Sequence, residues 1–151
     1  MQIKDSFAVR ASIEDVWNFL LDLERVGECM PGVESLEAVD DTTYKGNLKV
    51  KIGPISAAFK GTARLVEIDE PHRLVADIVG DDKAGASSVK ATFSATLEKI
   101  EEGVRVVYEV DVSIRGRLGQ FGLTVVHGTA KKMTAQFVEC LQEKLSADVE
   151  A

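Results

Sequence analysis

The sequence predicts an α+β fold in which a curved antiparallel sheet of about seven strands holds a long C-terminal helix across its concave face. Between residues 33 and 114, apolar and polar side chains alternate, which is typical of strands with one solvated face. Over residues 126–145, apolar side chains recur every three or four positions, which is typical of an amphipathic helix. Since the apolar face of the sheet must be covered, we expect this helix, the largest element, to cover it.

The first thirty residues predict one strand and two short helices. Residues 2–9 alternate and indicate a strand. Ser12 is a natural N-cap residue, and the acidic Glu14 favours the first turn of a helix that begins there. A second short helix is expected over residues 21–28. Pro31-Gly32 ends it, because proline cannot continue a helix and glycine turns the chain freely.

Turn signals divide the alternating part of the chain into strands. Gly53-Pro54, Glu70-Pro71 and Glu101–Gly103 each mark a turn, and residues 80–87 indicate a loop. The clearest expected strands cover residues 44–52, 55–68, 73–79, 89–97 and 104–114. No repeat, low-complexity tract or linker interrupts the pattern, so residues 1–151 are expected to form a single ligand-binding domain.

Composition and charge exclude several classes of protein. The net charge of −7 argues against general nucleic-acid binding, which depends on Lys and Arg neutralising phosphates. The first residues lack the apolar stretch of a signal peptide and no window resembles a transmembrane helix, so a cytoplasmic location is expected. Cys29 and Cys140 provide neither a zinc set nor a disulfide framework, and we expect both to be reduced thiols.

The inward-facing positions of the strands are unusually small. Ala57, Gly61 and Ala63 share one strand face, and Ala76 and Ala95 lie on the following strands. Packed interiors contain few voids, so such residues either let the helix approach closely or leave a space that accepts an apolar guest. Glycines before the helix favour the second interpretation, because a loosely held segment there could open as a gate.

The predicted ligand-binding residues combine aromatic, aliphatic and alanine side chains. They are Phe59, Ala63, Ala76, Ile78, Phe93, Ala95, Tyr108, Val110, Phe121, Val125 and Phe137. The predicted gate consists of Gly53, Pro54, Gly119 and Gly122. These assignments depend on register, because a shift of one residue along a strand exchanges its two faces.

Catalytic side chains are scarce at these positions. An enzyme built around such a pocket needs an inward-pointing acid, base or oxyanion donor, and the inner strand faces offer Tyr44 and Tyr108. His72 follows a turn proline and is expected at the surface. His127 lies on the helix with no acid within one turn and no second histidine to complete a metal site. We therefore predict no catalytic residue and no metal site.

Basic residues gather in two stretches that contain no acidic residue, 42–66 and 115–138. Both stretches adjoin the predicted gate. A basic rim on an acidic protein suits docking to an anionic membrane or an acidic partner. The alternative is an ordinary solvated strand face.

Six short segments form a specific pattern that spans most of the chain. They are Glu28–Glu34, Gly53–Ile55, Ala58–Gly61, Gln120–Gly122, Gly128–Lys132 and Gln136–Phe137. In this order they resemble segments of the carbon monoxide dehydrogenase CoxG family, which belongs to the wider START-like and Bet v 1-like helix-grip superfamily of lipid-transfer, pollen-allergen and polyketide-cyclase domains. The resemblance implies a helix-grip fold around a hydrophobic cavity.

The resemblance also implies an accessory role in the aerobic molybdenum carbon monoxide dehydrogenase system. The expected partners are that enzyme, with its large, medium and small subunits, and the inner face of the cell membrane. The expected ligand is a quinone, either menaquinone or ubiquinone, which would carry the enzyme's electrons. Members of this family often continue into an apolar tail beyond the helix, whereas this sequence stops at Ala151. Either the membrane contact is transient, or this sequence lacks a tail that the protein has.

Two other functions are weighed against the carrier. One is a scaffold that recruits the dehydrogenase to the membrane or assists its maturation without transferring a ligand. The other is a cyclase-like or hydrolytic enzyme, which ranks last because the inner positions lack an acid–base pair.

Overall fold

The computed structural model describes the chain except for residues 1, 53, 84, 86, 121–122 and 151. The described elements are β1 (Gln2–Val9), α1 (Ile13–Leu21), α2 (Leu23–Cys29), β2 (Val33–Ala38), β3 (Thr43–Ile52), β4 (Ile55–Asp69), β5 (Arg73–Asp82), β6 (Ser87–Ile100), β7 (Gly103–Gly116), the 3₁₀ helix η1 (Arg117–Gln120) and α3 (Leu123–Glu150). This element order confirms the predicted α+β fold class.

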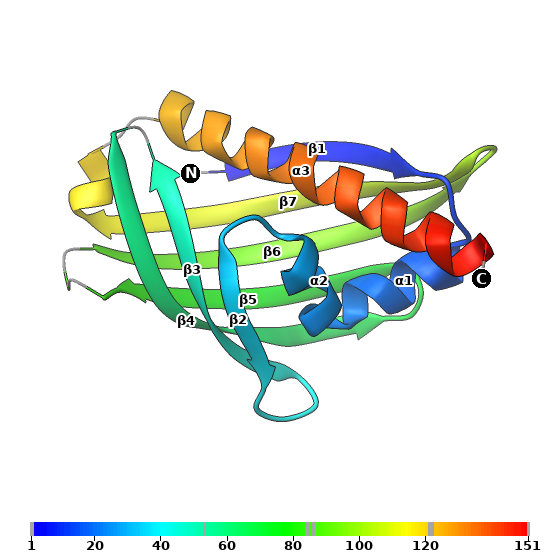
Figure 1. Ribbon diagram of the computed structural model, residues 1–151, viewed down its shortest axis with the longest axis horizontal. Helices are drawn as coiled ribbons and strands as arrows, with labels where there is room; N and C mark the ends of the chain where they lie inside the picture. Colours follow the sequence, from blue (N-terminus) through cyan, green and yellow to red (C-terminus); the bar gives the residue numbers. More distant parts are fainter. Residues whose placement is uncertain (1, 53, 84, 86, 121–122, 151) are drawn as a thin grey trace.

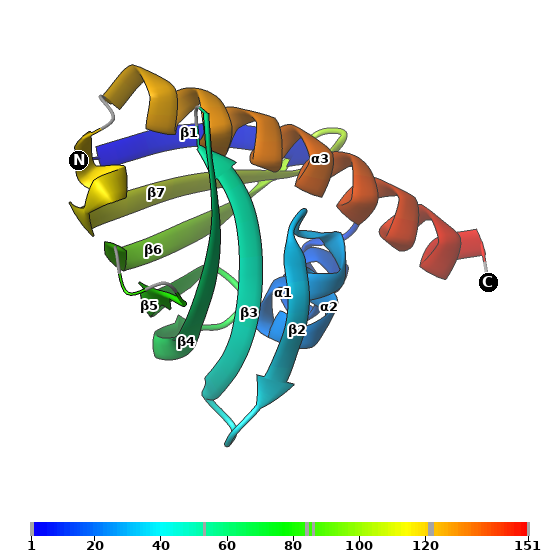
Figure 2. The same ribbon diagram turned by 60° about the vertical axis from the view of Figure 1, so that its left-hand side comes forward.

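All seven described strands form one antiparallel sheet in the order β1-β7-β6-β5-β4-β3-β2 (Figure 1). β2 to β7 follow one another as a meander, and β1 joins the far edge beside β7. The sheet is strongly curved, and α3 crosses its concave side near β1 and β7, while α1 and α2 lie between β2 and the C-terminal part of α3 (Figure 2). The two edge strands are therefore the first two strands of the chain, joined by α1 and α2.

Local sequence signals account for the helical region before β2. The Ser12 hydroxyl accepts a hydrogen bond from the Asp15 backbone N–H at 3.1 Å, which caps α1 as predicted. Asp22 has an extended backbone and separates α1 from α2. The second helix therefore begins at Leu23, two residues later than expected, because the chain must turn at Asp22.

The core consists of two separate clusters of buried side chains. The larger cluster joins α1, the sheet and the C-terminal half of α3, and its largest members include Trp17, Phe19 and Leu141. The smaller cluster joins the β3–β4 end of the sheet to Leu118 of η1 and Val126 of α3. α3 is thus buried near both ends of its described length, and Thr134 between them is half-buried.

A disulfide joins Cys29, the last residue of α2, to Cys140 on α3, with 5.4 Å between the two Cα atoms. The expectation of two reduced thiols is therefore wrong. The cysteines lie 111 residues apart, and only the packing of α2 against α3 brings them together. Nothing in the local sequence around either cysteine indicates this proximity.

Residues 80–82, expected in a loop, belong to β5. Gly80 pairs with Gly61 of β4 and with Val89 of β6. The glycine and the aspartates that suggested a loop are accommodated because pairing on both sides supplies the backbone hydrogen bonds.

No helix among the described residues is long and apolar enough to cross a membrane.

Candidate functional site

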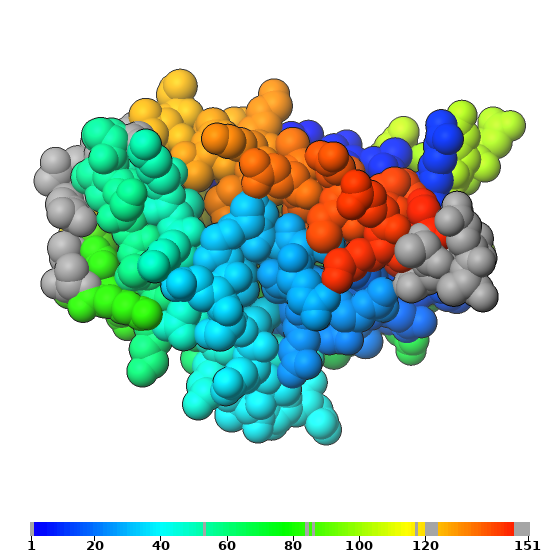
Figure 3. All heavy atoms as spheres, in the orientation of Figure 1, coloured from blue at the N-terminus to red at the C-terminus, as the bar shows by residue number. Residues whose placement is uncertain are grey.

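An apolar cavity with two adjoining chambers lies between the sheet and the helices. The first, here called the helix chamber, has a volume of about 250 Å³ and is bounded by α1, α2, α3 and the middle of the sheet. Its lining residues are Phe7, Leu20, Leu23, Val26, Gly27, Met30, Val33, Leu36, Ala63, Leu74, Ala76, Ile78, Phe93, Ala95, Val106, Tyr108, Thr134 and Phe137. Side chains of α2 and β2 meet those of α3 over the front of this region (Figure 3).

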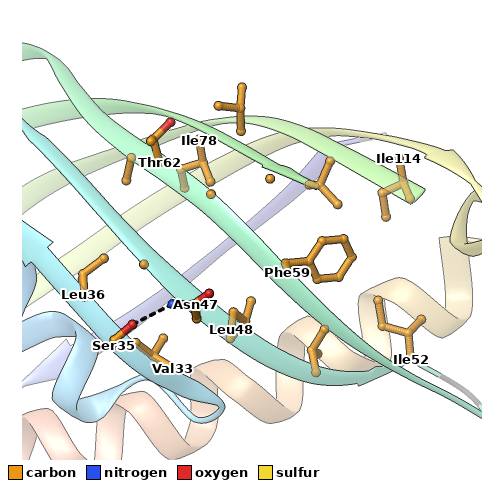
Figure 4. A pocket seen from close by; sticks show the side chains of 17 residues that line it. Val33, Ser35, Leu36, Asn47, Leu48, Ile52, Phe59, Thr62, Ile78 and Ile114 are labelled. Carbon is orange, nitrogen blue, oxygen red and sulfur yellow. Dashed lines mark hydrogen bonds between the residues drawn. The ribbon is translucent and has the colours of Figure 1, made fainter. Parts of the chain in front are cut away.

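The second chamber, here called the strand chamber, has a volume of about 280 Å³ and is bounded mainly by β2 to β5 and by the adjacent ends of β6 and β7 (Figure 4). Its lining residues are Val33, Ser35, Leu36, Gly46, Asn47, Leu48, Val50, Ile52, Phe59, Gly61, Thr62, Ala63, Ile78, Val79, Gly80, Val89 and Ile114. Apart from Ser35, Asn47 and Thr62, these side chains are apolar, so the chamber suits an apolar guest.

The two chambers meet at Val33, Leu36, Ala63 and Ile78, which line both of them. We call these four residues the waist. Ile78 is 37% exposed although it lies on the inner face of β5, between Ala63 of β4 and Ala91 of β6. Because its two neighbours are alanines, much of the Ile78 side chain borders open space.

Two glycines of the strand chamber are fixed by close backbone contacts, and a third is not. A Cβ atom at Gly61 would lie 2.2 Å from the Val79 carbonyl oxygen, and one at Gly46 would lie 2.3 Å from that of Ser35. At Gly80 the nearest atom to an added Cβ, the Lys60 carbonyl oxygen, is 3.8 Å away. An added Cβ at Gly80 would therefore make only ordinary van der Waals contacts, to this oxygen and to the Phe59 side chain.

Aromatic side chains form one wall of the helix chamber. The rings of Phe93 and Tyr108 stack with centroids 6.1 Å apart, and Phe7 lies 6.1 Å from Tyr108. Phe7 also contacts Phe137 of α3 edge to face at 6.3 Å. Such a wall offers flat, apolar surfaces against which a planar ring can stack.

The polar side chains among the described residues of this chamber are Tyr108 and Thr134. The Tyr108 hydroxyl donates to Thr134 Oγ1 at 3.2 Å, and the Thr134 hydroxyl donates to the Ala130 carbonyl at 2.9 Å. Burial raises the pKa of the Tyr108 hydroxyl above its ordinary value of 10.0, the Thr134 hydrogen bond opposes this shift, and the Asp5 carboxylate adds to it. The hydroxyl is therefore protonated at neutral pH.

The basic stretch of β3 has acidic partners on β2, which the one-dimensional pattern did not show. Lys49 forms an ion pair with Glu34 at 3.6 Å, and Lys45 pairs in register with Glu37. This part of the predicted basic rim is therefore mixed in charge.

Comparison with protein families decides where the chain belongs. The family model for the G subunit of carbon monoxide dehydrogenase (CoxG) matches residues 6–146. The chain belongs to the CoxG family. Among curated proteins, none matches this chain. The family takes its name from carbon monoxide dehydrogenase, and the name implies an accessory protein associated with that enzyme.

Solved structures confirm the helix-grip fold. A conserved protein from Geobacillus kaustophilus is 21% identical with a TM-score of 0.88, covering 97% of this chain and 96% of its own. A START superfamily protein from Mycobacterium smegmatis is 12% identical with a TM-score of 0.73 and 97% of both chains covered. An aromatase/cyclase, ZhuI, from Streptomyces sp. R1128 is 11% identical with a TM-score of 0.71, covering 99% of this chain and 95% of its own. This CoxG family member thus has a START-like and Bet v 1-like fold.

The structure brings most of the predicted ligand-binding residues of this CoxG family member to the cavity. Predicted residues that line at least one chamber are Phe59, Ala63, Ala76, Ile78, Phe93, Ala95, Tyr108 and Phe137. Whether they bind a ligand remains a prediction. Phe121, Gly53 and Gly122 lie outside the described residues. Pro54 is exposed at the β3–β4 turn and Gly119 belongs to η1, at the end of the molecule where the gate is predicted.

Two predicted residues do not line either chamber. Val110 packs against the larger core cluster, because it lies beside Ile3 of β1 in the region that α3 covers. Val125 is 37% exposed, whereas its neighbour Val126 is buried. One residue corresponds to a rotation of about 100° around a helix, so the orientation of α3 about its axis places Val126 rather than Val125 inward.

The lining residues contributed by α2, by Met30 that follows it and by β2 were not predicted from the sequence. Leu23, Val26 and Met30 face the helix chamber, and Val33 and Leu36 belong to the waist. Their spacing of three and four residues through Met30 is an available signal, because it predicts one apolar helix face.

Proposed function

We propose that this chain is a non-catalytic carrier of a hydrophobic ligand, a menaquinone or ubiquinone, that works with a molybdenum carbon monoxide dehydrogenase at the inner face of the cell membrane. The observation that carries the proposal is the apolar cavity between the sheet and the helices. An apolar space of this kind favours a guest that water solvates poorly.

A quinone matches the chemistry of the lining. Its ring is flat, as required for stacking on Phe93 and Tyr108, and its isoprenoid tail is apolar throughout. Burial of apolar area contributes roughly 25 cal/mol per Å², so a shielded tail supplies substantial affinity. An enzyme that oxidises its substrate must pass electrons to an acceptor, and a carried quinone would be that acceptor.

The state of Tyr108 supports a binding role rather than catalysis. Its hydroxyl donates a hydrogen bond to Thr134, and its raised pKa keeps it protonated, so it is unsuited to act as a general base at neutral pH. A protonated hydroxyl can still orient a ligand by hydrogen bonding.

The decisive experiment is to purify the protein from its own host, record native mass spectra, and identify lipids released by solvent extraction. We expect one quinone per protein molecule. Protein that is free of quinone, and that takes up no added menaquinone or ubiquinone, would contradict the carrier role and leave recruitment or assembly of the dehydrogenase as the better account.

A matched pair of variants distinguishes cavity binding from lipid adhering to the surface. Ala63→Phe places a ring at the waist, whereas Ala135→Phe places the same ring on the exposed side of α3. We expect Ala63→Phe to lose the co-purifying quinone and Ala135→Phe to retain it. Equal retention by both variants would place the quinone outside the cavity.

A further inference from the structure

We propose that one ligand fills both chambers at once, with its ring in the helix chamber and its flexible tail in the strand chamber. The protein then selects a quinone by tail length as well as by ring. This inference rests on the proposed function, since it takes a tailed quinone as the ligand. The first support for this inference is the waist. The two chambers adjoin there, because both are lined by Val33, Leu36, Ala63 and Ile78.

The waist leaves room for a narrow chain. Ala63 and Ala91 present single methyl groups on either side of Ile78. Ile78 itself is 37% exposed on an inward-facing position, so its surface faces the passage. A flexible tail can lie along this side chain and bury it, which removes apolar surface from water on both partners.

The two chambers differ in the chemistry of their walls. The helix chamber has the aromatic group of Phe7, Phe93, Tyr108 and Phe137, and its two hydroxyls. In the strand chamber, Phe59 alone among the described lining residues is aromatic. The other apolar side chains there are aliphatic. Stacking favours the ring beside the aromatic wall, and the Tyr108 hydroxyl can turn from Thr134 to donate to a ring carbonyl.

The floor of the strand chamber favours an extended apolar chain. Gly46, Gly61 and Gly80 pair in register across β3, β4 and β5 and expose backbone rather than side chains there, and an added Cβ at Gly80 would meet no atom closer than 3.8 Å. A trough of this shape accepts a tail lying across the strands. The length of the tail that fits is limited by the size of the chamber, about 280 Å³.

The first test is a tail-length series on the unmodified protein. Quenching of Trp17, the sole tryptophan, reports binding of ubiquinone rings that carry no, one, two or four isoprene units, and a menaquinone series repeats the measurement. We expect affinity to rise by about tenfold or more between no tail and two units. Equal affinity at all lengths would overturn this inference while leaving the carrier role intact. Absence of binding by every quinone would overturn both.

Variants then assign the ring and the tail to their chambers. Gly80→Leu fills the strand chamber and should abolish the advantage of tailed quinones while leaving the tailless ring unaffected. Ala76→Leu fills the helix chamber and should weaken every member of the series by about the same factor. Gly128→Leu is the matched control, because an added Cβ at Gly128 meets no atom within 4 Å.

The opposite pattern, in which Gly80→Leu weakens the tailless ring and Ala76→Leu affects tailed quinones alone, would overturn the assignment. Circular dichroism and thermal unfolding establish that each variant is folded. If a variant does not fold, Gly80→Ala and Ala76→Val are the smaller replacements, and the tail-length series on the unmodified protein decides the proposal by itself.

Discussion

The two halves of α3 are held to the protein by different means. In the C-terminal half, Phe137, Leu141 and Leu145 are buried in the larger core cluster. Among the described residues of the N-terminal half, Val126 alone is buried. Its neighbours Val125 and His127 are exposed. One end of the helix is therefore part of the main core, and the other end rests on a small contact.

The N-terminal half has the Tyr108–Thr134 hydrogen bond, but most of the described polar and covalent links increase this difference. The Cys29–Cys140 disulfide, the hydrogen bonds between Gln142 and the Arg10 backbone, and the ion pair of Lys144 with Glu28 all attach the C-terminal half. In a folded protein, the segment with the fewest stabilising contacts opens first. The C-terminal half of α3 is therefore a fixed wall of the helix chamber, and we expect the N-terminal half to detach at the lower free-energy cost.

The largest expected effect concerns the disulfide. Replacing both Cys29 and Cys140 by serine should lower the free energy of unfolding by about 4 kcal/mol, because the bond closes a long loop in the unfolded chain. Urea denaturation of the oxidised protein and the double variant measures this difference. Reduction of the unmodified protein with dithiothreitol should produce the same loss, and a change below about 1 kcal/mol would show that the bond is absent in solution.

Truncation of core residues measures how firmly each half of α3 is held. Leu141→Ala should lower the free energy of unfolding by about 3 kcal/mol, since Leu141 is fully buried. Val126→Ala should cost about 1 kcal/mol, since the smaller cluster can relax around it. Chemical denaturation gives both values. A larger cost for Val126→Ala than for Leu141→Ala would break the distinction between the two halves.

A smaller effect is expected where α3 contacts the end of β1. The Gln142 side chain accepts from the Arg10 N–H at 2.8 Å and donates to the Arg10 carbonyl at 3.2 Å. Gln142→Ala should lower the free energy of unfolding by about 1 kcal/mol. Gln136→Ala, on an exposed position of the same helix, is the control and should change it by less than about 0.5 kcal/mol.

The smallest effect is a pH dependence from Glu28. Its hydrogen bond and charge interaction with Lys144 lower its pKa below the ordinary value of 4.5. Because the pKa is lower in the folded state, the ionised Glu28 stabilises the folded protein above pH 4.5. This stabilisation is lost as the pH falls through the pKa of Glu28 in the folded state. Melting temperatures from about pH 7 to about pH 3 should fall slightly less steeply for Glu28→Gln than for the unmodified protein. Identical slopes would show that the exposed ion pair contributes nothing.

Periodic patterns in the sequence were sufficient to predict the fold class. Alternation and the turn signals predict the strands, and Ser12 predicts the start of α1, because these features depend on residues close together in the chain. The small inner residues Ala63 and Ala76 also correctly indicate open space, since both line the cavity.

The remainder of the site depends on contacts that periodicity does not encode. The orientation of α3 about its own axis decides that Val126 rather than Val125 faces inward. The curvature of the sheet brings Val33 and Leu36 of β2 to the waist. The disulfide joins residues 111 positions apart, so it requires the assembled fold. These three features depend on how the helices and strands pack against one another, and not on where each element begins in the sequence.

The edge position of β1 has a consequence for synthesis of the protein on the ribosome. β1 emerges first, but its partner is β7, and Val9 pairs with Val104 while Gln2 pairs with Asp111. At about 5 to 20 residues per second, the first strand waits roughly 5 to 20 seconds for its partner. During that interval β1 has no partner strand, and chaperones that bind extended apolar segments have their opportunity before residue 111 is translated.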